Sequence, residues 1–181
     1  GFYAPTASLQ QTRCAAGSFT ADARNGKCTP CDAGTYQGSK GRTACAVCEL
    51  GGYCMAGVAA VTMCDAGTYG NETGLESAAG CHLCPGGTAC SLGSSEPTLC
   101  TSGTFAAASG SRICSRCDEG TYQPDAGQTA CEDCGPGFMC PPGSSSKIPA
   151  SCMPGTYSSQ EVVLDLDDCE PCPVAFWCPG G

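Results

Sequence analysis

The chain has 181 residues, and 20 of them are Cys, a share typical of disulfide scaffolds. Leu, Ile, Val and Phe together number only 21, too few for a conventional apolar core. The formal net charge of -9 disfavours nucleic acid as a partner, because an acidic chain repels phosphate. The composition excludes large α/β folds and helical bundles, and it predicts a small disulfide-rich fold in an oxidising, extracellular compartment.

The sequence contains no apolar run near the roughly 20 residues that span a bilayer. Its first residues also lack the basic and apolar pattern of a signal peptide. We therefore expect no membrane span in this fragment, and any signal peptide to be cleaved or to lie upstream of Gly1.

The cysteines form two blocks of ten, and the second block repeats the first at an offset of 86 residues that becomes 88 from Cys152 onward. Three modules in each block open with Cys-x-x-Gly-[Thr/Ser]-[Tyr/Phe]. The predicted domains are residues 1–13, the end of a preceding module; the first block 14–99, with modules 14–30, 31–63 and 64–99; and the second block 100–181, with modules 100–116, 117–151 and 152–181.

The first four residues resemble the stretch Gly137–Cys140, so Ala4 occupies the position of a fourth cysteine. Gly1 then falls inside a module, and the chain is predicted to be an internal stretch of a longer array.

Each opening motif predicts a turn followed by a short strand. The Gly three residues after the opening Cys is expected to adopt a positive φ, so that the next Thr-Tyr pair can begin a strand. The aromatic ring is expected to pack on the disulfide of its own module and on the next Pro-Gly turn. The predicted architecture is a tandem array of cysteine-rich modules with short β-hairpins and turns, stacked into an elongated rod.

The spacing favours disulfides between neighbouring cysteines, because a two-cysteine module can close only on itself. Crossed pairing within the four-cysteine modules, first to third and second to fourth, stays open. The favoured bridges are Cys14 with Cys28, Cys31 with Cys45, Cys48 with Cys54, Cys64 with Cys81, Cys84 with Cys90, Cys100 with Cys114, Cys117 with Cys131, Cys134 with Cys140, Cys152 with Cys169, and Cys172 with Cys178.

Two other uses of cysteine fit parts of the pattern. The set Cys28, Cys31, Cys45 and Cys48 has the spacing of a four-thiolate zinc site, but zinc there would leave Cys14 without its local partner. A redox Cys-x-x-Cys pair needs a lowered thiol pKa, and no helical pattern follows these pairs. His82, the one histidine, is interpreted as a surface spacer. We therefore predict no catalytic residue, no cofactor and no metal.

Covalent glycans are expected on the chain. Asn71-Glu72-Thr73 is an N-glycosylation sequon in the loop between Cys64 and Cys81, so Asn71 is the predicted glycosylation site. The Ser-rich and Pro-rich stretches at 141–149 and 5–8 are either O-glycosylated or flexible linkers.

The last module carries two distinctive groups. Asp165, Asp167, Asp168 and Glu170 form the densest acidic group, which we interpret as a solvated face rather than a calcium site. The residues 162–164 are expected to form a short strand. With Phe176 and Trp177 they either seal the core of this module or contact another chain.

Repeats such as CDAGTYQGSKGRTACAVC and CDEGTYQPDAGQTACEDC resemble the ephrin-receptor-like cysteine-rich repeat, a relative of tumour-necrosis-factor-receptor modules. The resemblance covers essentially the whole chain and implies no catalytic residues. An unbroken array of this kind is similar to very large surface proteins of protists and algae, including mastigoneme-like glycoproteins that form hairs on cilia. This implies an extracellular or cell-surface location, and points to the ciliary or flagellar surface.

Two functions are consistent with these features. The first is a structural segment of an extracellular fibre or cell-surface coat glycoprotein, which assembles with itself or with other extracellular proteins through lateral or end-to-end contacts. The second is a ligand-binding or adhesion receptor ectodomain, which would need an exposed aromatic or Arg hot spot in one module. Phe176 and Trp177 stand where the first block has Thr88 and Ala89, so they are the best candidates for that hot spot.

Overall fold

The computed structural model describes residues 1–4, 10–22, 26–135, 138–149, 154–158 and 169–179. The chain divides into two compact units, unit 1 with Gly1–Cys84 and Cys90–Pro97, and unit 2 with Pro85–Ala89 and Thr98–Gly181. Ten two-stranded antiparallel sheets and one short 3-10 helix, η1 (Ala78–Gly80), form the regular structure of the described ranges. The fold is a small, hairpin-based one, as the composition predicts.

Every strand in these ranges is two residues long and pairs with the next or previous strand along the sequence. The hairpins of unit 1 are β1 (Phe2–Tyr3) with β2 (Thr12–Arg13), β3 (Ser18–Phe19) with β4 (Thr29–Pro30), β5 (Thr35–Tyr36) with β6 (Ala46–Val47), β7 (Gly52–Tyr53) with β8 (Thr62–Met63), and β9 (Thr68–Tyr69) with β10 (His82–Leu83). Those of unit 2 are β11 (Thr88–Ala89) with β12 (Thr98–Leu99), β13 (Thr104–Phe105) with β14 (Ser115–Arg116), β15 (Thr121–Tyr122) with β16 (Glu132–Asp133), β17 (Phe138–Met139) with β18 (Ile148–Pro149), and β19 (Thr156–Tyr157) with β20 (Glu170–Pro171).

The turn predicted at each opening motif is confirmed. The glycine three residues after the opening Cys has a φ between 78° and 94° at every one of the six positions, and a strand begins at the next residue. Only glycine adopts this left-handed conformation without steric cost. The six glycines are Gly17, Gly34, Gly67, Gly103, Gly120 and Gly155.

The four-cysteine modules 31–63, 64–99 and 117–151 each contain two hairpins of the same kind, which the sequence analysis did not separate. Gly51 and Gly87 also stand three residues after a cysteine, with φ of 77° and 78°, and β7 and β11 begin directly after them. The second strand of these hairpins again ends at the residue before the next opening cysteine. One hairpin type therefore serves both kinds of module.

The hairpin of β1 and β2 has the register of the later ones. Phe2 faces Arg13 in the same way that Gly52 faces Met63. Ala4 then follows β1 as Cys54 follows β7, which agrees with its prediction as a substituted cysteine position.

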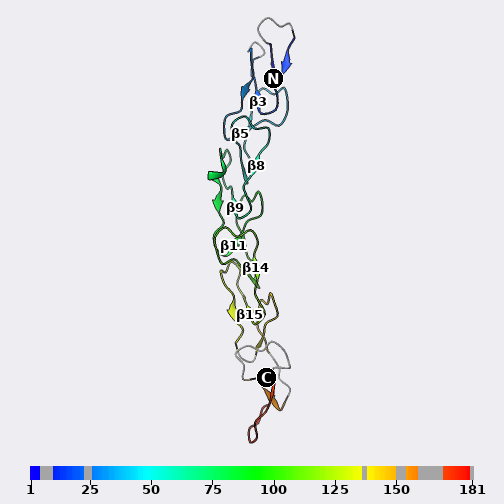
Figure 1. Cartoon of the computed structure of the whole chain (residues 1–181), viewed down its shortest axis with the longest axis vertical. Helices are drawn as coiled ribbons and strands as arrows, with labels where there is room; N and C mark the ends of the chain where they lie inside the picture. Colours follow the sequence, from blue (N-terminus) through cyan, green and yellow to red (C-terminus); the bar gives the residue numbers. More distant parts are fainter. Residues whose placement is uncertain (5–9, 23–25, 136–137, 150–153, 159–168, 180–181) are drawn as a thin grey trace. The chain divides into compact units, whose positions relative to one another are not determined.

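In unit 1, the backbone of a turn glycine extends its own hairpin through the carbonyl and bonds the next hairpin through the N–H. The N–H of Cys31 donates to the carbonyl of Gly17 (2.9 Å), and the N–H of Gly17 donates to the carbonyl of Gln37 (2.8 Å). Gly34 repeats both bonds, accepting from Cys48 at 2.9 Å and donating to Cys54 at 2.8 Å. Within unit 1, Figure 1 shows the labelled strands β3, β5, β8 and β9 following one another in chain order. Both polar backbone groups of the turn glycine are thereby satisfied.

The turn glycine also contacts a second glycine, which lies in the loop of the hairpin two places further along the chain. A Cβ added to Gly34 would lie 2.5 Å from the carbonyl oxygen of Gly74, and Gly17 and Gly57 are related in the same way. The N–H of Gly74 donates to the carbonyl of Cys48 at 2.8 Å, which holds the turn in place. The close approach of two backbones explains why the repeat needs glycine at both positions.

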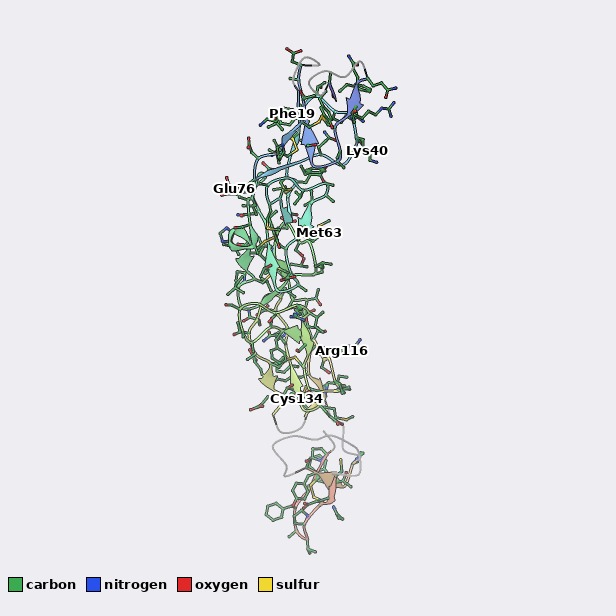
Figure 2. All side chains as sticks on the ribbon, turned by 45° about the horizontal axis from the view of Figure 1, so that its top comes forward. Phe19, Lys40, Met63, Glu76, Arg116 and Cys134 are labelled. Atoms are coloured by element: carbon green, nitrogen blue, oxygen red, sulfur yellow. A yellow bond between two sulfur atoms is a disulfide. The ribbon has the colours of Figure 1, made fainter. Side chains whose placement is uncertain are left out.

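Cystines form the buried core. Apart from Thr20, every fully buried large side chain among the described residues is a cysteine. The predicted core of one ring with its cystines is wrong in this respect, because the rings of the opening motifs are only half-buried: Phe19, Tyr36, Tyr69, Phe105, Tyr122 and Tyr157. Figure 2 shows disulfides inside the path of the ribbon, while side chains such as Lys40 and Arg116 extend outward.

In each of two cysteine loops, a glutamine side chain makes hydrogen bonds to the backbone of that loop. The buried Gln123 donates through Nε2 to the carbonyl of Ala130 (2.8 Å) and accepts at Oε1 from the N–H of Asp125 (3.0 Å). Gln37 makes the same two bonds to Ala44 and Ser39. These bonds satisfy polar groups that a turn leaves without strand partners.

Candidate functional site

The cysteines of the described ranges are all bonded in disulfides. Nine bridges join nearest neighbours, as the spacing favours, and none of these nine is crossed. Cys169 is disulfide-bonded as well, while Cys152, its predicted partner, lies outside the described residues. The nine bridges are Cys14–Cys28, Cys31–Cys45, Cys48–Cys54, Cys64–Cys81, Cys84–Cys90, Cys100–Cys114, Cys117–Cys131, Cys134–Cys140 and Cys172–Cys178.

The Cys-x-x-Cys spacing has a structural cause. Its two middle residues form the second strand of a hairpin, as Thr29 and Pro30 do in β4. Cys28 closes the preceding loop with Cys14, and Cys31 closes the following loop with Cys45. Sulfurs bonded in this way are not thiolates, so the zinc alternative at Cys28 to Cys48 has no ligands in this structure.

The predicted acidic group is only partly within the described residues. Asp165, Asp167 and Asp168 lie outside them, as do residues 162–164 with the predicted strand. Glu170 lies on β20 and accepts a hydrogen bond from the hydroxyl of Tyr157 at 3.3 Å. In the described ranges no three His, Cys, Asp or Glu side chains come together as a metal site.

Three hairpins carry a Tyr–Glu pair on their surface. The hydroxyl of Tyr122 donates to Oε2 of Glu132 at 2.9 Å, and that bond raises the pKa of Tyr122 above its ordinary value. Tyr36 donates to Glu49 at 3.2 Å with the same effect on its pKa. The charge of Glu170 is the main cause of the raised pKa of Tyr157. The Tyr122–Glu132 and Tyr157–Glu170 pairs link the two strands of a hairpin at its surface, whereas Glu49 follows Cys48 in the turn that precedes β7.

His82 lies exposed on β10, as its interpretation as a surface spacer requires. Its ring lies 5.7 Å from the ring of Tyr69, its cross-strand partner. A histidine packed on a tyrosine in this way is an ordinary cross-strand contact.

The predicted glycosylation site is accessible. Asn71 is exposed and lies between β9 and η1. Residues 141–149 are held in a turn in which Ser144 Oγ donates to the carbonyl of Pro141 (2.6 Å). Lys147 Nζ lies 4.9 Å from the centre of the Tyr122 ring and 5.5 Å from that of Phe138, so this stretch is part of the hairpin array. Residues 5–8 lie outside the described ranges.

Two surface hollows stand out. One, of about 410 Å³, is lined by Tyr3, Thr12, Arg13, Ala15, Ser18, Lys27 and Cys28. The other, of about 310 Å³, is lined by Tyr157, Pro173, Phe176, Trp177 and Cys178. Phe176 and Trp177 are 75% and 86% exposed, so they do not seal the core of their module.

Sequence reasoning on the whole chain missed a concentration of positive charge. Five of the eight Lys and Arg residues lie within the first 42 positions, together with only two of the 17 Asp and Glu residues. The net charge of the whole chain does not show this concentration of cations. A position-by-position comparison of the repeated sequence does show it.

Residues 17–59 and 103–152, more than half of the chain, match the family described as tyrosine-protein kinase ephrin type A/B receptor-like. The chain belongs to this family of ephrin-receptor-like cysteine-rich repeats. The comparison with curated proteins finds no match. The repeat family and the disulfides point to an extracellular or cell-surface location and indicate a non-catalytic module. Among the residues that the structure describes, no helix has the length and apolar character needed to cross a membrane.

Proposed function

We propose that the chain is a non-enzymatic structural segment of an extracellular fibre or cell-surface coat glycoprotein, which assembles through lateral or end-to-end contacts. The ladder of hairpins is the observation that carries this proposal. Turn glycines such as Gly17 and Gly34 donate their N–H to the next hairpin and accept at their carbonyl from the cysteine that ends their own hairpin, and the buried side chains beneath are mostly cystines. Such a repeat gains stability from its neighbours in sequence and can be extended by adding copies. A location on the ciliary or flagellar surface extends the same proposal.

Glycosylation at Asn71 is part of the proposal. The sequon is exposed in a loop that contributes no strand, so a glycan there leaves the hairpins undisturbed. Peptide mass spectrometry of the native material under non-reducing conditions should find a glycan on Asn71 and no free thiol. An Asn71→Gln chain should lose that glycan mass and keep all its disulfides. An unmodified Asn71 in the native protein would remove the glycoprotein part of the proposal.

Electron microscopy of the native material tests the assembly. Filaments or an ordered coat labelled by an antibody to this chain are the expected result, and labelling of cilia would support the narrower location. Discrete single particles that bind a partner to saturation would contradict the structural role.

A receptor or adhesion ectodomain is the second candidate. It is favoured by Phe176 and Trp177, which are largely exposed where the first block has the buried Thr88 and the half-buried Ala89. Exposed aromatic residues of this kind are common binding hot spots. Saturable binding by the monomeric chain that is lost in Phe176→Ala/Trp177→Ala, and kept in Val174→Ala, would select this function.

A further inference from the structure

Four exposed cations of unit 1 form a basic cluster, which we define as Arg13, Lys27, Lys40 and Arg42. Backbone bonds bring three of them together: the N–H of Gly41, between Lys40 and Arg42, donates to the carbonyl of Cys14 at 2.8 Å. The Arg13 side chain crosses Gly41, where an added Cβ would lie 3.4 Å from Arg13 Cδ.

The fourth cation faces the same surface. Lys27 and Arg13 both line the hollow of about 410 Å³, beside the side chains of Tyr3, Thr12 and Ser18. Arg13 has its guanidinium 5.5 Å from the centre of the Phe2 ring. Within the described part of the chain, no carboxylate lies within ion-pair distance of any of the four cations. The positive charge of this cluster is thus available to a partner.

The matching positions further along the chain show that the fold does not require these charges. At the offset of 86 residues, the four positions hold Leu99, Ile113, Ala126 and Gln128. The backbone there is the same: Gly127 donates to the carbonyl of Cys100 at 2.7 Å, as Gly41 does to Cys14. Leu99 and Ile113 are 60% and 78% exposed without any charge. The cations are therefore an addition to the hairpin rather than part of its stability.

A complementary surface lies on the hairpin of β15 and β16, where Asp118, Glu119, Glu132 and Asp133 are all exposed. The N–H of Cys134 donates to the carbonyl of Gly120 at 2.9 Å, which places Asp133 beside the turn that carries Asp118 and Glu119. The first block has Asp32, Ala33, Ala46 and Val47 at these positions. The basic cluster and the acidic hairpin therefore lie at different positions of the repeated hairpin fold.

We propose that the basic cluster of one chain binds the acidic hairpin β15–β16 of a second copy. The occupant is a second copy because the matching charge is present on the same chain, on a hairpin whose counterpart keeps only one of the four carboxylates, Asp32. The two surfaces differ, so the contact is heterologous, and each bound copy leaves one basic cluster and one acidic hairpin free for further copies. This inference rests on the proposed structural function and specifies its lateral contact.

Sedimentation velocity of the 181-residue chain tests the contact. The weight-average sedimentation coefficient should rise with protein concentration in about 20 mM NaCl and lose that dependence in about 500 mM NaCl, because salt screens exposed charges. Arg13→Gln/Arg42→Gln should weaken the association about tenfold or more. Leu99→Glu/Gln128→Glu makes the same change in net charge at the matching positions 86 residues further along and should associate like the unmodified chain. A thiol assay that finds no free cysteine checks the fold of each variant.

A charge exchange gives the sharper result. The reversal Arg13→Glu/Arg42→Glu should abolish association, and adding Glu119→Arg/Asp133→Arg in the same chain should restore it. The proposal is overturned if Arg13→Gln/Arg42→Gln associates as strongly as the unmodified chain. It is also overturned if the unmodified chain stays monomeric and the cluster instead retains it on immobilised heparin, which would assign the cluster to a sulfated polysaccharide. Filaments in the native material together with either result would overturn this contact alone and leave the structural function standing.

Discussion

The turn glycines combine two constraints that can be separated experimentally. Gly103 and Gly155 both have positive φ values, 78° and 91°. A Cβ on Gly103 would overlap the carbonyl oxygen of Gly143, whereas a Cβ on Gly155 would meet nothing within 4 Å. The left-handed conformation costs an alanine about 1–2 kcal/mol, and the overlap adds the cost of moving a backbone that is hydrogen-bonded.

We predict that Gly103→Ala destabilises its hairpin more than Gly155→Ala does, by roughly 1–3 kcal/mol. The readout is hydrogen exchange of the amides bonded to each glycine carbonyl, Cys117 for Gly103 and Cys172 for Gly155. Gly155→Ala serves as the control for the dihedral angle alone. Equal acceleration at both amides would show that the overlap is relieved without cost.

The Tyr122–Glu132 pair gives a pH-dependent prediction. The pKa of Tyr122 is raised above 10.0, chiefly by its hydrogen bond to the Glu132 carboxylate. A raised pKa means that the neutral phenol is favoured in the folded state. The stabilisation from this bond is therefore complete below pH 10.0 and is lost as the pH rises through the pKa of the folded state.

Glu132→Gln should lower the pKa of Tyr122 toward its ordinary value of 10.0, because it removes the negative charge and the strong acceptor together. Tyrosine labelled with carbon-13 at Cζ and titrated by NMR reports this directly. Asp133→Asn, which neutralises the neighbouring carboxylate, is the matched control and should leave most of the raised pKa in place. A titration of Tyr122 that Glu132→Gln does not move would contradict the hydrogen bond.

At the scale of the hairpin, the sequence was most informative where chain geometry leaves no choice. A glycine with positive φ before the first strand of each hairpin follows from the opening motif, because only glycine tolerates that φ, whereas the second strand within Cys-x-x-Cys was not predicted. The hairpins opened by Cys48 and Cys84 were harder to recognise, since Gly52 and Ala89 replace parts of the Thr-Tyr signature. The meeting of Gly34 with Gly74 depends on packing between hairpins, which no local pattern encodes.

The turn after Cys172 departs from the glycine rule. Ala175 stands three residues after Cys172 and has a φ of 74°, the only positive φ of a non-glycine residue in the described ranges. The neighbouring bond survives, since the N–H of Gly155 donates to the carbonyl of Cys178 at 3.0 Å. This alanine therefore adopts the turn at a steric cost.

Ala175→Gly should stabilise the last hairpin, by up to about 1 kcal/mol after the greater chain entropy of glycine is subtracted. Slower hydrogen exchange at the Gly155 amide is the expected measurement. Ala33→Gly makes the same change where φ is not positive, and it should leave exchange unchanged or faster. If Ala175→Gly and Ala33→Gly change hydrogen exchange in the same way, the relief of backbone strain at Ala175 is ruled out.

Across the molecule, the connections are local. Among the nine described disulfides the longest separation is 17 residues, and the hydrogen bonds between hairpins reach only to the next hairpin or the one after. Since the buried side chains of the described ranges are mostly cystines, these ranges contain no apolar core shared by distant hairpins. Stability should then behave as a sum of neighbouring contributions, in the manner of repeat proteins.

Removing one bridge should therefore loosen only its neighbourhood. We predict that Cys117→Ser/Cys131→Ser accelerates hydrogen exchange about a hundredfold for amides within residues 103–143, since a loop of this length contributes about 3 kcal/mol. The Cys31 amide, bonded to Gly17, should exchange as before. Removing the matched bridge with Cys31→Ser/Cys45→Ser should reverse the pattern, because Cys31 N–H bonds Gly17 and the Gly57 N–H bonds the carbonyl of Cys31. Uniform acceleration along the whole chain in either variant would mean that the hairpins unfold as one cooperative body, and the local account of this fold would fail.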